Sequence, residues 1–410
     1  METKNKKIID SLVYILLALI LVFSIFKFSS VRNDHLETQE KELVILISSN
    51  SVQCPEFSFT TDCVEYEFED QGEIHSFTYL SGSSPHARPE VNDNVMVSLM
   101  EDHEGNAFYQ YQGYDRSSGY LITIIIFLAV VIIVARSTGA RSFLSLLISI
   151  LMIINIIIPA LREGRDPYLT VIIGGFVLIS ILVYISQGFN LITHSSVIGS
   201  AISLLISLPL AIFLAGILKI SGTGDEYSAM LSISTSDVIN IRNITIASFI
   251  LAGIAVLDDS SISQASIVSE LMEHVSSKQE IFRSAMRVGI RHVGSMINTL
   301  FLAYVASSLP MVILIVMNQP DLFTVMNSEF VAEEFVRIVI GSIAIVISIP
   351  ITTFITMNLP KLISGKNVNR TNKFINYLFI FCFHIGYLLL YLHPSSLLHK
   401  TSTIFNSIIN

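Results

Sequence analysis

Apolar segments alternate with short polar loops from Tyr120 to His393, and one further apolar stretch, Ile8–Phe28, precedes a polar region. A hydrocarbon core about 30 Å thick needs roughly 20 apolar residues of helix for each crossing. The pattern predicts an α-helical integral membrane protein with nine transmembrane helices. The first is expected over 8–28, and the others over 120–135, 142–161, 168–186, 196–219, 243–257, 293–317, 337–357 and 374–392.

The polar region 29–119 has a different pattern, in which short runs of β-branched and aromatic residues are separated by turn residues. The runs are Leu43–Ile47, Val64–Phe68, Phe77–Leu80, Val91–Leu99 and Phe108–Tyr111. Five short strands predict a small extracytoplasmic all-β domain, a barrel or a sandwich, between the first and second helices. Because the region lacks a basic patch and a helical period, we expect no nucleic-acid binding.

Composition supports the membrane prediction. Hydrophobic residues make up 52% of the 410 residues, charged residues only 14%, and the mean hydropathy is +0.65. Soluble domains carry about 25% charged residues. A soluble globular core is therefore excluded as the main part of the chain.

Basic residues orient the predicted helices through the excess of Lys and Arg in cytoplasmic loops. Lysines precede the first apolar stretch, whereas the region after it is acidic, which places the N-terminus in the cytoplasm. Nine crossings of the cell membrane then place the C-terminus outside. The expected parts are a cytoplasmic N-terminus with an anchor (1–28), the β domain (29–119), an eight-helix membrane domain (120–393) and an extracytoplasmic tail (394–410).

The first apolar stretch also resembles the start of a signal peptide. Its apolar run is longer than a usual signal-peptide core, and no A-x-A cleavage site follows it. We therefore expect an uncleaved anchor.

Three cysteines occur in the chain. Cys54 and Cys63 bracket a short stretch of the predicted outer domain and are candidates for a disulfide. Two reduced thiols in a hairpin are an equal alternative, because spacing alone does not fix the geometry of the Cβ atoms. Cys382, in the last predicted span, is expected to act as a small apolar side chain.

Adjacent carboxylates follow the span 243–257. A charge inside a bilayer costs at least ~2.5 kcal/mol, so ionisable residues near a span indicate function. Asp258 and Asp259 could exchange a proton or a cation. Alternatively, Asp259 or Ser260 could cap a new helix over 262–275 by accepting hydrogen bonds from free backbone N–H groups.

A polar stripe marks the span 293–317, because His292, Ser295 and Thr299 share one helical face. Interhelical hydrogen bonding would account for such a stripe. A candidate cluster at one level of the membrane comprises Asp258, Asp259, Gln264, His292, Asn298 and Tyr304. The triplet Ser-Leu/Ile-Pro at 207–209, 308–310 and 348–350 allows kinked or broken helices of the kind found in transporters.

Common catalytic motifs are absent from the sequence. It contains no G-x-x-x-x-G-K-[ST] loop for a nucleotide, no H-E-x-x-H metal motif and no G-x-S-x-G elbow. The Gly-Thr-Gly-Asp run at 222–225 lacks the strand and helix that a phosphate site needs. We therefore expect no enzyme, no cofactor, no metal and no bound nucleotide.

The order of several motifs resembles the YibE/F family of multi-pass membrane proteins. The matching stretches are 158–161, 187–190, 224–226, 253–259, 264–266, 292, 298–300, 303–304, 309–310, 336–337, 341–342 and 350–353. The Leu-Asp-Asp-x-x-x-x-Gln-Ala-Ser block at 257–266 is the most specific of them. The resemblance implies a multi-pass membrane fold and a membrane partner of the same family, but no mechanism.

Two functions remain open at this point. The first is a permease-like protein that moves a small solute or ion along the candidate cluster. The second is a non-transporting scaffold or sensor whose outer β domain binds an envelope partner. An intramembrane hydrolase is less favoured, because Asp258 and Asp259 are adjacent and do not lie on facing helices.

Overall fold

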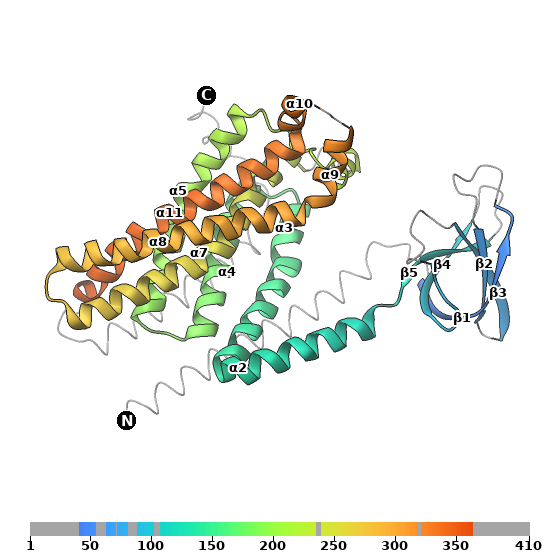
Figure 1. Ribbon diagram of the computed structural model, residues 1–410, viewed down its shortest axis with the longest axis horizontal. Helices are drawn as coiled ribbons and strands as arrows, with labels where there is room; N and C mark the ends of the chain where they lie inside the picture. Colours follow the sequence, from blue (N-terminus) through green and yellow to red (C-terminus); the bar gives the residue numbers. More distant parts are fainter. Residues whose placement is uncertain are drawn as a thin grey trace. The chain divides into compact units, whose positions relative to one another are not determined.

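The computed structural model describes residues 41–54, 63–70, 72–80, 88–101, 107–234, 239–318 and 321–363. The predicted spans 8–28 and 374–392 and the predicted tail lie outside these residues. The chain divides into two compact units (Figure 1). One contains the β strands and the helix that follows them as far as Val134, and the other contains the helices from Ala135 onward.

The β unit is one antiparallel five-stranded sheet, which confirms the predicted small β domain. Its strands are β1 (Lys41–Val52), β2 (Cys63–Asp70), β3 (Glu73–Leu80), β4 (Asn94–Glu101) and β5 (Ala107–Tyr114). Their spatial order is β3-β2-β1-β4-β5, with the long β1 strand in the centre. A disulfide joins Cys54, just after β1, to Cys63 at the start of β2.

Aromatic side chains close the sheet around its core. Tyr66 and Phe68 on β2 are completely buried. The ring of Tyr111 on β5 lies 5.8 Å from that of Phe77 and 5.3 Å from that of Tyr79, both on β3. Because β3 and β5 are the two edge strands, these contacts show that the sheet curls into a partly open barrel.

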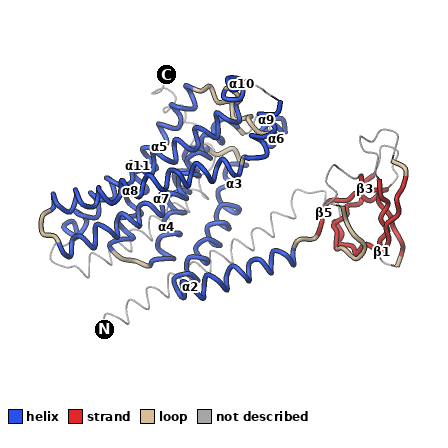
Figure 2. Tube along the Cα trace, viewed as in Figure 1, coloured by secondary structure: helices blue, strands red, loops and turns tan. Residues whose placement is uncertain are grey.

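The rest of the described chain is helical (Figure 2). The helices are α2 (Ser117–Met152), η2 (Ile153–Ile157), α3 (Ile158–Arg162), α4 (Pro167–Gln187), α5 (Leu191–Ile217), α6 (Glu226–Ser234), α7 (Ile241–His274), α8 (Lys278–Ser307), α9 (Leu309–Asn318), α10 (Leu322–Met326) and α11 (Glu329–Ile363).

Five helical stretches among the described residues are long and apolar enough to cross a membrane. They are Ser117–Arg162, Pro167–Gln187, Leu191–Ile217, Ile241–His274 and Glu329–Leu359, and the bent pair of α8 and α9 would make a sixth. The first covers two predicted spans, which meet near Arg136, where the backbone is not helical (φ 52°, ψ −131°). The count of nine crossings stays a prediction.

The predicted span 293–317 is not one straight helix. It is divided between α8 and α9, which are bent by 65° at Ser308. Pro310 explains the break, because proline lacks a backbone N–H and disfavours a helical conformation in the residue before it. The other two proline triplets do not break their helices, since Pro209 lies within α5 and Pro350 within α11.

The capping interpretation of Asp259 was wrong. Helix α7 runs without interruption from Ile241 to His274, and Asn240 caps its start by accepting a hydrogen bond from the backbone N–H of Asn243. The predicted break after Leu257 does not occur, because the polar residues that follow it pack between helices.

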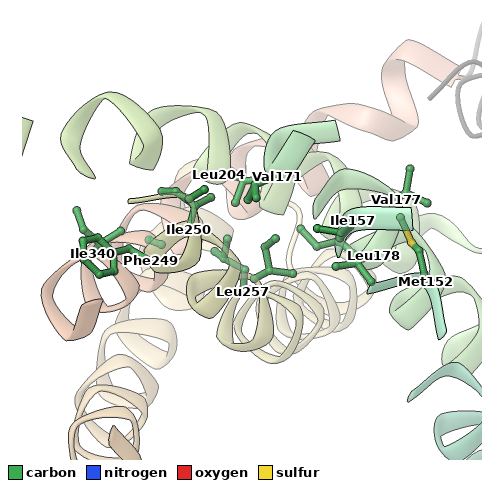
Figure 3. Packing of buried hydrophobic residues seen from close by; sticks show 14 of the residues in the cluster. Met152, Ile157, Val171, Val177, Leu178, Leu204, Phe249, Ile250, Leu257 and Ile340 are labelled. Atoms are coloured by element: carbon green, nitrogen blue, oxygen red, sulfur yellow. The ribbon is translucent and has the colours of Figure 1, made fainter. Parts of the chain in front are cut away.

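Helices α4, α5, α7 and α11 enclose the main apolar core (Figure 3). Phe249 and Leu257 on α7 and Ile340 on α11 are completely buried in it. Small residues allow the helices to approach closely. A Cβ atom on Gly253 of α7 would lie 4.0 Å from the Cα of Gly341 on α11.

Candidate functional site

Hydroxyl groups connect α5, α7 and α11. The hydroxyls of Ser200 on α5 and Ser261 on α7 lie 2.6 Å apart, and those of Ser260 on α7 and Ser348 on α11 lie 3.0 Å apart. We call the set the polar seam. Its members are at most 1% exposed: Ser200, Ser203, Ser260, Ser261, Gln264, Ser348, Thr352 and Thr353.

Gln264 links three helices at this seam. Its Nε2 donates to the Thr353 hydroxyl on α11 at 2.7 Å and to the Ala285 carbonyl on α8 at 3.2 Å. Its Oε1 is buried and has no hydrogen-bond partner among the described residues. A Cβ atom at Gly289 would lie only 2.5 Å from that oxygen, so α8 can approach because residue 289 is a glycine.

Asp258 lies in the middle of α7 and is partly buried. Its Oδ1 atom is buried, and within the described part of the chain it accepts no hydrogen bond. Asp259 is exposed. The two adjacent carboxylates therefore have different environments, because consecutive positions of a helix point about 100° apart. A carboxylate with a buried oxygen that lacks a hydrogen-bond partner can take up a proton or a cation.

The other predicted residues do not join Asp258 and Gln264. His292 and Asn298 on α8 are exposed, and Thr299 donates to the carbonyl of Ser295 on its own helix. No contact among the described residues joins all six into the expected single cluster, which stays a prediction. Helix α8 turns a different face toward α7 and α11, formed by Ile281, Ala285, Gly289 and Leu300, all buried.

Tyr304 belongs to a second group of polar residues, at the other end of α8. The guanidinium of Arg337 on α11 lies over its ring at 5.9 Å and over the ring of Phe249 on α7 at 5.5 Å. Arg337 also forms an ion pair with Glu334 on its own helix. Arg337 thus connects three helices, as Gln264 does at the seam.

Carboxylates at the start of α11 hold the loop between α5 and α6. Glu329 Oε1 accepts hydrogen bonds from the backbone N–H groups of Ser221 at 2.6 Å and Gly222 at 2.9 Å. Glu333, which is 4% exposed, accepts one from the N–H of Gly224 at 3.1 Å. Consecutive backbone N–H groups form a concave anion site, and here the protein's own glutamates occupy it.

Asp225 ends this loop and begins α6. Partial burial raises the pKa of Asp225, but hydrogen bonds from the hydroxyl and backbone N–H of Ser228 outweigh that effect and hold it below its usual value. The carboxylate therefore stays ionised and stabilises the positive end of α6.

The polar seam was largely missed by reasoning from the sequence. Serine and threonine are common in membrane helices, and most of these hydroxyls also donate to a carbonyl one turn earlier in their own helix, as Ser203 does to Gly199. The motif resemblance was the better guide, because it included Gln264, Gly224–Glu226, Val336–Arg337 and 350–353. These stretches lie at the polar seam and near the loop 221–224 that Glu329 and Glu333 hold, which we call the glutamate-bound loop.

The described residues contain no group of three or more His, Cys, Asp or Glu side chains that could hold a metal ion. Helix α7 instead carries one carboxylate oxygen without a hydrogen-bond partner, that of Asp258, and the buried hydroxyl and amide groups of the polar seam. Such groups can pass a proton or coordinate a hard cation.

Comparison with known proteins agrees with these motifs. Neither the curated proteins nor the solved structures contain a match to the chain. A family model described as YibE/F-like protein matches residues 123–361, which include the polar seam and the glutamate-bound loop. The chain is thus a member of the YibE/F-like family.

Proposed function

We propose that the chain is a multi-pass protein of the cell membrane that moves a small solute or ion, with Asp258 on the pathway. The observation that carries the proposal is the buried Oδ1 of Asp258, which has no hydrogen-bond partner among the described residues. Desolvating a carboxylate without a partner costs several kcal/mol, so such a group is retained where it has a function.

The proposed topology has nine crossings, with the N-terminus in the cytoplasm and the C-terminus outside. Five or six apolar helices among the described residues support the membrane location. The distribution of Lys and Arg supports the orientation. The proposal includes no catalytic step, cofactor or metal.

Two substitutions in purified, reconstituted protein test the pathway. Asp258→Asn removes the buried charge and keeps the size, whereas Asp259→Asn changes the exposed neighbour and is the matched control. Proton, sodium and potassium gradients are imposed across proteoliposomes, and the dissipation of each is followed with ion-sensitive dyes. We expect flux in the unchanged protein and in Asp259→Asn, and its loss in Asp258→Asn. Equal flux in all three, above empty liposomes, would contradict the role of Asp258.

Accessibility of the same position gives a readout that needs no substrate. Asp258→Cys in a background without other cysteines is exposed to membrane-impermeant thiol reagents from each side. Labelling from both sides supports a water-filled pathway. Labelling from neither side, in protein that still folds, would argue against transport through this position.

A second function is a scaffold or sensor whose outer β domain binds an envelope partner, such as a membrane protein of the same family. Exposed apolar side chains on the central strand favour it: Leu43, Ile45 and Ile47 are 64%, 57% and 49% exposed. Large apolar residues in a row on one strand are typical of an interaction surface. If the chain is such a non-transporting scaffold, replacing all three by threonine should abolish partner capture, and the unchanged protein should show no flux above empty liposomes.

A further inference from the structure

Three arginines occupy successive turns on one face of α8. Arg283, Arg287 and Arg291 are spaced four residues apart, so their side chains lie above one another. All three are exposed, and among the described residues they form no salt bridge or side-chain hydrogen bond. The opposite face of the helix packs against α7 and α11 through Ile281, Ala285 and Gly289. The guanidinium groups therefore point away from the helix bundle.

The same face becomes apolar further along the helix. Ile290 is 62% exposed and follows the second arginine, and Phe301 and Leu302 are 51% and 65% exposed. Gly294 and Asn298 lie between the two ends. A helix rises 1.5 Å per residue, so Arg291 and Phe301 are about 15 Å apart along the axis, half of a hydrocarbon core of about 30 Å.

Charge on this face is strongly one-sided. Glu280, in the first turn, is the one carboxylate of α8, against three arginines on the exposed face. Guanidinium groups bind phosphate oxygens through paired hydrogen bonds and are less strongly hydrated than ammonium groups. On this face the arginines are followed, over half the thickness of a bilayer, by exposed apolar residues. A phospholipid has the same order, because its phosphate lies at one end and its acyl chains at the other.

We propose that the Arg283, Arg287 and Arg291 face of α8 binds the phosphate groups of anionic phospholipids in the cytoplasmic leaflet. The inference rests on the proposed membrane insertion but not on transport. A soluble anionic partner would account for the arginines but not for the exposed Ile290, Phe301 and Leu302. Anionic lipids in the leaflet account for both.

The test uses the full chain in nanodiscs made from an equal mixture of phosphatidylcholine and phosphatidylglycerol. After mild delipidation, the lipids that remain bound are counted by mass spectrometry. The variants are the triple change Arg283→Gln, Arg287→Gln, Arg291→Gln and the triple change of the same residues to Lys. The control is Arg136→Gln with Arg141→Gln, two exposed basic residues elsewhere on the cytoplasmic side of the proposed topology.

We expect the unchanged protein and the control to retain phosphatidylglycerol in excess over phosphatidylcholine. The Gln variant should lose this excess and the Lys variant should keep part of it, because Lys retains the charge but not the paired hydrogen bonds. Equal enrichment in the Gln variant would overturn the proposal. Displacement of the lipid by millimolar glycerol phosphate would also overturn it, because the site would then take a free phosphate.

Two further readouts keep the proposals separable. Helical circular dichroism shows whether the Gln variant is folded, and flotation with liposomes shows whether it is in the membrane at all. Failure of flotation in the unchanged protein would remove the membrane proposal and this one together. Loss of lipid enrichment without loss of the Asp258-dependent flux would leave the proposed transport intact.

Discussion

One carboxylate oxygen of Glu329 accepts two hydrogen bonds from Ser221, one from its backbone N–H and one from its hydroxyl, each 2.6 Å long. The two residues are 108 positions apart in the sequence. The contact joins the first turn of α11 to the loop that follows α5. Because α5 and α11 both contribute to the polar seam, the loop fixes how these helices meet at one end.

Replacing Glu329 by Ala should release this loop. The change removes the acceptor of three hydrogen bonds, from Ser221 N–H and Oγ and from Gly222 N–H. Bonds to a charged group contribute roughly 1.5–3 kcal/mol each when shielded, and this exposed site should lose about 2 kcal/mol in total. Hydrogen exchange at the amides of Ser221 and Gly222 should become much faster.

The control for this change is Glu163→Ala. Glu163 forms an exposed salt bridge with Arg165, two positions away, and connects no separate helices. Its loss should leave exchange in the 221–224 loop unchanged. If hydrogen exchange at Ser221 and Gly222 is equally fast in the two variants, the Glu329 contact does not hold the loop.

The strands and most helices followed from the hydrophobic pattern, but the course of α7 did not. The stretch Asp258–Ser266 looked like a helix end because most of its residues are polar. In the structure Ser260 and Ser261 face α11 and α5, where hydroxyls replace apolar contacts. A hydropathy pattern cannot distinguish a polar loop from a helix whose buried face is polar, because both lower the mean hydropathy of the segment.

The sequence also could not predict which face of α8 packs against α7 and α11. His292 and Thr299 were correctly placed near one face, but which face is buried depends on packing. Gly289 and Ala285 allow close approach to Gln264, and this turns the polar stripe outward. The partner of Gln264, the hydroxyl of Thr353, is 89 residues away in the chain, and no local pattern identifies it.

Substitution of Gly199 by Ala should separate α5 from α11. A Cβ atom at Gly199 would overlap the hydroxyl of Thr352 and lie 3.2 Å from the Thr352 Cα, which belongs to the backbone. Backbone cannot rotate away, so we expect a loss of roughly 1–3 kcal/mol of stability. Thermal unfolding in detergent would measure it.

Gly216→Ala is the matched control on the same helix. Apart from its own stretch of helix, no atom of the described residues lies within 4 Å of a Cβ at Gly216. Alanine is a better helix former than glycine by roughly 0.5–1 kcal/mol, so this variant should be equally stable or more stable. A similar loss in both variants would mean that helix propensity, and not the contact with Thr352, sets the result.

A double substitution can test the contact between α7 and α8. Gly289→Ala should destabilise the protein, because the new methyl group would lie 2.5 Å from Gln264 Oε1 and 2.6 Å from Ile349 Cγ2. Gln264→Ser alone should cost less, since membrane hydrogen bonds average about 0.6 kcal/mol each. Together the two changes should cost less than their sum, because the shorter side chain makes room for the methyl group.

Additive costs in this cycle would show that Ile349, and not Gln264, limits the approach of α8. Gly294→Ala serves as the control on α8, because in the described part of the chain nothing outside its own stretch of helix lies within 4 Å of a Cβ there. It should combine additively with Gln264→Ser. Guanidinium-induced unfolding of each of the five variants gives the required free energies.

Alkaline pH should weaken the β unit through Tyr111. Burial, and then the nearby Tyr114 and Tyr79, raise the pKa of Tyr111 to about 12. In the unfolded chain its phenol ionises near pH 10, so its contribution to stability is complete below that pH and is lost as the pH rises toward 12. The difference in phenolate absorbance between the unchanged protein and Tyr111→Phe should therefore titrate near pH 12, and Tyr111→Phe should lose less stability at alkaline pH.

Tyr120→Phe, which removes a phenol that is 64% exposed, is the control. A Tyr111 difference that titrates near pH 10 in the folded protein would contradict the burial of its ring against Phe77 and Tyr79 of β3.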